Sequence, residues 1–131
     1  MAKTTKVTLV DFISKAVNKY SNRQLIIEIE TEMGTMVFNR PGENELLSYV
    51  SECSRSQDDL GLVLKASKSL VYNSSSFLQN DDLQKKLDVV DPLDTVTKVF
   101  EINETVEIAS KIAETFMGAE KVEEIEKEIK N

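Results

Sequence analysis

The spacing of apolar residues follows two different periods along the first third of the chain. From Val7 to Tyr20 apolar positions recur every three or four residues, which is typical of one face of a helix. Thr8 and Asp11 stand at the two positions of a capping box, so this helix is expected to begin directly after Thr8. From about 23 to 40 the period changes to two and β-branched residues are dense, which predicts a β-hairpin with its connection at Gly34.

From residue 43 to residue 118 the pattern is helical. Ser56 with Asp59, Asp91 before Pro92, and Asn103 are the expected helix caps, and Gly118 is expected to end the last helix. A polar loop over 72–82 interrupts the helices, and a short helix should follow it. Leu83 and Leu87 are four apart, which suits that short helix. The residues expected to face the core are Leu46, Leu47, Val50, Cys53, Leu60, Val63, Leu64, Leu70, Val71, Phe77, Leu78, Leu93, Val96, Val99, Phe100, Ile102, Val106, Ile108, Ala109, Ile112, Ala113 and Phe116.

These elements predict an α+β fold: a mainly α-helical single domain over 1–118 with one β-hairpin near the N-terminus. Residues 119–131 are expected to form an amphipathic C-terminal tail helix with Val122, Ile125 and Ile129 on one side. Such a short helix is marginal alone, so this apolar stripe is the candidate partner-binding surface. Folding of the tail onto its own core is the alternative.

Composition and charge narrow the class of protein. A chain of 131 residues with 40% hydrophobic and 30% charged residues is expected to form one globular domain, and its single cysteine favours a reducing cytosol. No apolar stretch is long enough to span a membrane, so no membrane contact is expected. The net charge of −7 argues against binding nucleic acid.

The charge is also uneven along the chain. Residues 1–24 hold five basic residues against Asp11 alone, a net of +4, so the remainder carries −11. A bipolar chain of this kind can associate head to tail or place its acidic part on a basic partner. An unevenly charged but merely solvated surface is the alternative.

Groups able to do chemistry are scarce. The chain has no histidine, which removes the commonest general base, and Cys53 lies in an apolar helical stripe, as a core thiol does. The spacing of Asp88, Asp91 and Asp94 departs from that of a calcium-binding loop, and no glycine-rich phosphate loop is present. We therefore expect no catalytic, metal-binding or cofactor-binding residues, and a protein that acts through contact with other chains.

One stretch, "LKASKSLVYNSSSFLQNDDLQKKLDVVDPLDTVTKVFEINETVEIASKIAETFMG", resembles the tail assembly chaperones of contractile-tailed phages and defective prophages. Its order of features carries the resemblance: a helix running into "VYNSS", then Asp82-Leu83-Gln84, Asp91-Pro92, a short helix with an aromatic end, and a glutamate-rich helix closed by Gly118. The resemblance covers about residues 43–118. The family tends to have glycine where Asn103 stands, and asparagine serves equally well as a helix cap.

This resemblance implies a noncatalytic protein of the host cell cytoplasm that is absent from the mature virion. It would bind the tape measure protein, help to recruit tail tube protein subunits, and self-associate as a homo-oligomer along its partner. Such genes often encode a second, longer frameshift product that shares the same N-terminal part. A structural head-tail or tail-completion component that stays in the particle is the alternative function.

Overall fold

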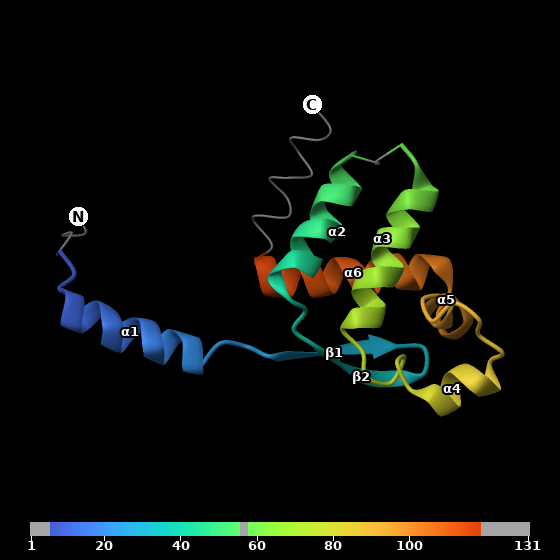
Figure 1. Ribbon diagram of the computed structural model, residues 1–131, viewed down its shortest axis with the longest axis horizontal. Helices are drawn as coiled ribbons and strands as arrows, with labels where there is room; N and C mark the ends of the chain where they lie inside the picture. The colour runs from blue at the N-terminus through green and yellow to red at the C-terminus, as the bar shows by residue number, and fades with distance from the viewer. Residues whose placement is uncertain (1–5, 56–57, 119–131) are drawn as a thin grey trace.

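The computed structural model describes residues 6–55 and 58–118 of the chain. Within these residues six helices and one two-stranded antiparallel sheet follow one another, which confirms the mainly helical α+β fold (Figure 1). The elements in chain order are α1 (Leu9–Ser21), β1 (Ile26–Thr31), β2 (Gly34–Asn39), α2 (Glu43–Arg55), α3 (Leu60–Asn73), α4 (Asp81–Lys86), α5 (Asp94–Val99) and α6 (Ile102–Met117).

The hairpin pairs β1 with β2 so that one face meets the helices and the other stays open. Ile27 lies opposite Phe38 and Ile29 opposite Met36, and these four side chains contribute to the core or pack against it. Ile26 and Val37 point to the exposed face, as the two-residue period of a strand requires. The connection consists of Glu32 and Met33 rather than lying at Gly34 as predicted, because β1 ends at Thr31 and β2 begins at Gly34.

Gly34 has a φ of +119°, which a side chain would strain.

The core forms where α6 crosses α3 and meets α2, α5 and the hairpin (Figure 1). One face of α6 is buried along its length, and small residues on it let α3 approach closely. The backbone N–H of Asn39 donates to the carbonyl of Ser74 at 2.7 Å, which ties β2 to the end of α3. The buried apolar cluster is Ile29, Phe38, Leu46, Leu70, Val71, Leu78, Val96, Phe100, Ile108, Ala109, Ile112, Ala113 and Phe116.

Three helices begin at other residues than the sequence predicted. Asp59 itself is the N-cap of α3, and its carboxylate accepts from the backbone N–H groups of Gly61 and Leu62. The Asp91 carboxylate accepts from the N–H of Leu93 in a turn before α5, and α5 begins only at Asp94. Helix α6 begins at Ile102 with Glu101 as its N-cap, so the predicted cap Asn103 lies inside the first turn of the helix.

The predicted caps at Thr8 and Gly118 are confirmed. The backbone N–H of Asp11 donates to the Thr8 hydroxyl at 3.2 Å, which satisfies one free donor at the start of α1. Gly118 has a φ of +94° at the end of α6. Both positions therefore follow the local rules that their residue types indicate.

Four residues expected in the core are exposed instead: Leu47, Leu60, Phe77 and Ile102. Leu60 and Ile102 are the first residues of their helices, at the edge of the body, where no neighbouring element covers them. Phe77 and Leu78 are adjacent in a turn, and only Leu78 points inward, with 1% of its surface exposed. Helical periodicity identifies an apolar face but not how much of it a neighbour covers.

The inner face of the hairpin should carry much of the stability of the body. Phe38→Ala removes a side chain that is 0% exposed, and it should lower the free energy of unfolding by about 3–5 kcal/mol through lost burial and a cavity. Val37→Ala on the open face is the matched control and should cost less than about 1 kcal/mol. Denaturant unfolding of both variants measures the difference, and equal losses would contradict the described register.

Candidate interaction surfaces

Helix α1 extends away from the body and contributes nothing to the core (Figure 1). None of its 13 residues is buried. The next element, β1, packs on α6 through its inner face. The core of the body, which is formed by the elements from β1 to α6, therefore contains no residue of α1. The helix is therefore an arm whose long sides face solvent.

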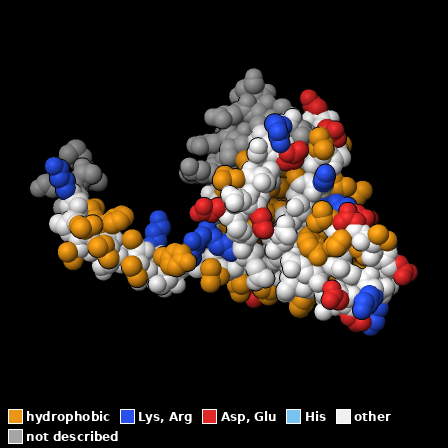
Figure 2. Space-filling model, viewed as in Figure 1, with side chains coloured by type: hydrophobic (Ala, Val, Ile, Leu, Met, Phe, Trp, Pro, Cys, Tyr) orange, Lys and Arg blue, Asp and Glu red, His pale blue; other side chains and the backbone are white. Residues whose placement is uncertain are grey.

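The arm presents a continuous apolar stripe. Val10 is 77% exposed, Phe12 is 59% exposed and Tyr20 is 71% exposed. Figure 2 shows hydrophobic side chains gathered along this helix. Exposed apolar surface of this extent on one element marks an interaction site in soluble proteins. The stripe consists of Leu9, Val10, Phe12, Ile13, Val17 and Tyr20.

Arg40 fixes the point at which the arm leaves the body. Its backbone N–H donates to the carbonyl of Leu25 at 2.7 Å, and its guanidinium donates to the carbonyl of Gln24 at 3.2 Å. The same guanidinium lies over the Phe116 ring at 5.2 Å from the centroid, so it is itself held by the core. Only Asn22 and Arg23 separate this anchor from the end of α1.

The polar side of the arm is basic. Lys15 and Lys19 lie on the helix, Arg23 follows it, and Asp11 is its only acidic residue. The Arg23 guanidinium stacks over the Tyr20 ring at 5.6 Å, so positive charge lies directly beside the apolar stripe. A partner for this helix should therefore combine apolar surface with acidic side chains.

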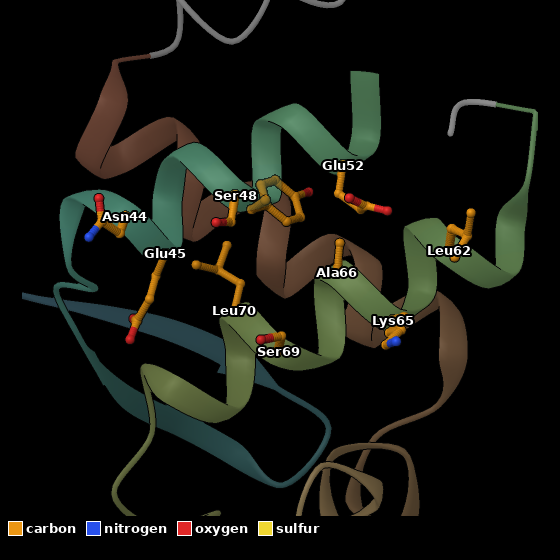
Figure 3. Close-up of a pocket in the computed structure, with 10 residues that line it drawn as sticks. Asn44, Glu45, Ser48, Glu52, Leu62, Lys65, Ala66, Ser69 and Leu70 are labelled. Carbon is orange, nitrogen blue, oxygen red and sulfur yellow. The ribbon is translucent and has the colours of Figure 1, made fainter. Parts of the chain in front are cut away.

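A groove lies between α2 and α3 (Figure 3), with the buried Ala66 and Leu70 at its base and with Glu52 already paired with Arg55 at 2.6 Å. Its cavity measures about 410 Å³. Figure 3 shows side chains from both helices turned toward this space, with Glu45 and Glu52 on α2 and Lys65 on α3. The residues that line the groove are Asn44, Glu45, Ser48, Tyr49, Glu52, Leu62, Lys65, Ala66, Ser69 and Leu70.

Two of the aspartates considered as metal ligands have structural partners among the described residues. Across 6–55 and 58–118 no group of three or more histidine, cysteine or acidic residues is arranged to hold a metal ion. Asp94 forms an ion pair with Lys68 at 2.7 Å that joins α5 to α3, and Asp91 accepts from the backbone N–H of Leu93. None of the described helices is long and apolar enough to cross a bilayer.

The sequence-predicted partner stripe of Val122, Ile125 and Ile129 lies outside the described residues. The arm, by contrast, is the surface that sequence reasoning did not select as a site. Its apolar face was evident from the periodicity, but periodicity cannot tell a stripe that packs on its own core from one that does not. One feature could have indicated that the stripe is exposed. Only residues 22–25 join α1 to β1, and so short a connection leaves little chain for α1 to fold back onto the body.

Comparison with known proteins gives no relative. No family model, curated protein or solved structure matches the chain.

The arm should be dispensable for the stability of the body. Phe12→Gln combined with Val17→Gln removes two exposed apolar side chains while keeping good helix formers, so the thermal midpoint of a dilute sample should shift by less than about 2 °C. Differential scanning calorimetry measures it, with Phe38→Ala as the destabilised reference. A large loss in the dilute arm variant would contradict the described position of α1.

Proposed function

We propose that this chain is a noncatalytic phage tail assembly chaperone that binds the tape measure protein and helps to recruit tail tube subunits. It acts in the host cell cytoplasm and leaves before the virion matures. The observation that best supports a role in contact is the arm, whose apolar stripe no other described element covers. The order of features over residues 43–118 supports the phage class.

Such a chaperone has to cover the apolar helices of a long partner until that partner has been assembled into the tail. A protein that does so needs apolar surface for contact and net charge for solubility. The arm supplies the first, and the net charge of −7 supplies the second. The predicted tail stripe of Val122, Ile125 and Ile129 is the contact that we assign to the tape measure protein.

Coexpression with a tape measure protein from the same gene cluster tests the proposal. That partner should be insoluble alone and should become soluble in a complex with this chain. Replacing Val122, Ile125 and Ile129 by serine should abolish the complex, because these side chains provide the apolar contact. The matched control, Glu124→Gln with Lys127→Gln, changes the opposite side of the same segment without altering net charge and should bind normally.

Two results would contradict the proposal. In the first, the tape measure protein stays insoluble in the presence of this chain and no complex elutes in size-exclusion chromatography. In the second, mass spectrometry of purified particles finds this chain in stoichiometric amounts, as for a head-tail or tail-completion component. A chaperone should be missing from such particles.

A further inference from the structure

We propose that two copies of this chain exchange their arms, so that α1 of each copy lies on the open face of the hairpin of the other. The open face consists of the outward-pointing residues of β1 and β2, which are Ile26, Glu28, Glu30, Thr35, Val37 and Asn39. This inference goes beyond the proposed function, because it concerns two copies of the chain alone and needs no tape measure protein.

The open face offers apolar surface that no described element covers. Ile26 is 48% exposed and Val37 is 47% exposed. Ile26 lies opposite Asn39, so Val37 is its diagonal neighbour on the adjacent strand and the two side chains form one patch. The inner face already packs on α6, and a sheet can carry a helix on each of its faces. A docked arm would therefore complete the cover of the hairpin.

The arm and the hairpin match in length. Helix α1 has 13 residues, which gives about 20 Å at 1.5 Å per residue. Strands β1 and β2 have 6 residues each, which also gives about 20 Å at 3.3 Å per residue. A helix laid along the strands would therefore contact the hairpin over its whole length.

The two surfaces carry opposite charge. Residues 6–23 hold four basic residues against Asp11, a net of +3, whereas residues 25–39 hold three glutamates and no basic residue, a net of −3. The side chains of Glu28 and Glu30 are exposed, and neither forms an ion pair within the described part of the chain. Glu30 accepts a hydrogen bond from the neutral hydroxyl of Thr35, which leaves its negative charge uncompensated. Charge therefore favours an arm on a hairpin over contact between two basic arms.

The charged side chains also match in spacing. Lys15 and Lys19 follow Phe12 by three and seven residues, so they flank the same edge of the apolar stripe. They are about 6 Å apart along the helix axis. Glu28 and Glu30 are alternate residues of β1, which places them about 7 Å apart along the strand. The basic edge of the arm can therefore lie along β1 while the stripe lies on the apolar patch.

The connection between α1 and β1 favours a second copy over the arm's own hairpin. The backbone N–H groups of Asn22 and Arg23 donate to carbonyls in the last turn of α1, at 3.1 and 3.3 Å. The carbonyls of Gln24 and Leu25 accept from Arg40. Folding back would have to reverse the chain within these four residues and break such bonds. Docking on a second copy breaks none, because the arm already extends away from the body (Figure 1).

Exchange of two arms also provides enough contact for a closed dimer. A stable interface buries on the order of 1,000 Å² or more. Each arm carries six apolar side chains that are more than half exposed, and reciprocal docking uses this surface twice. Both copies then make the same contact across a twofold axis, which leaves no arm and no open face for a third copy.

Purified full-length chain, without any partner, provides the first test. Light scattering behind size-exclusion chromatography should show a dimer whose fraction rises with concentration, and no larger species. The apolar variant Phe12→Gln with Val17→Gln should raise the dissociation constant of the dimer at least about tenfold. Raising the ionic strength should also weaken the dimer, because complementary charges contribute to it.

Charge reversal on either surface tests the pairing itself. The arm variant, Lys15→Glu with Lys19→Glu, places an acidic arm against an acidic hairpin. The hairpin variant, Glu28→Lys with Glu30→Lys, places a basic arm against a basic hairpin. Each variant alone should dimerise at least about tenfold more weakly than the unmodified chain, because like charges then face one another in both contacts.

The matched control is Lys85→Glu with Lys111→Glu, which makes the same change in net charge as the arm variant at exposed positions of α4 and α6. It should dimerise as the unmodified chain does. Circular dichroism melting of every variant separates lost association from lost folding.

Mixing the two charge-reversed variants distinguishes arm exchange from its alternatives. In the mixed pair the acidic arm meets the basic hairpin and the basic arm meets the acidic hairpin, so a 1:1 dimer should form again. A mixture that stays monomeric would overturn the proposal. A hairpin variant that dimerises fully would overturn it in favour of contact between arms. An unmodified chain that is monomeric at all concentrations would overturn it too, without bearing on binding of the tape measure protein.

Discussion

The packing of α6 against α3 and the hairpin is the interaction on which the rest of the structure depends. One face of α6 is buried from Thr105 to Phe116, and Ala109 and Ala113 on it are 0% exposed, so neighbouring backbone lies close. Small residues at a helix crossing allow that approach, while Ile112 and Phe38 fill the space around it. The hairpin gains the cover that two strands need in water from this helix.

This arrangement also explains why α1 is left outside. The inner face of the hairpin is already covered by α6, and Arg40 holds the entry to β1 by two hydrogen bonds and by its stacking on Phe116. The chain is therefore held to the body at Gln24 and Leu25, four residues or fewer after the end of α1. Burial of the arm would therefore require apolar surface that the core of the body does not provide.

Local sequence rules predicted the positions of the helices and strands better than they predicted which residues of those elements are buried. Thr8 and Gly118 were identified from backbone requirements that involve only a few neighbouring residues, and the structure bears both out. Gly34 was expected in the hairpin connection, but it is the first residue of β2. Asp59 and Asp91 do bond to backbone N–H groups, but the choice between adjacent candidate caps depends on tertiary packing that short patterns do not contain. Leu60 and Phe77 show the same limit for burial, since an apolar residue in the right phase stays exposed where no element covers it.

The candidate surfaces were harder to predict than the fold. An apolar helix face is exposed only where no other element packs on it, and local sequence patterns do not show which elements pack together. The stripe from Leu9 to Tyr20 is as regular as that of α6, yet only α6 meets a neighbour along its length. An isolated helix of 13 residues is marginal in water, and one cap at Thr8 contributes only about 1 kcal/mol. A partner that bound the arm would therefore also stabilise its helix. Coupled ordering of this kind lowers the affinity per unit of buried area, because part of the contact free energy is spent on ordering the helix.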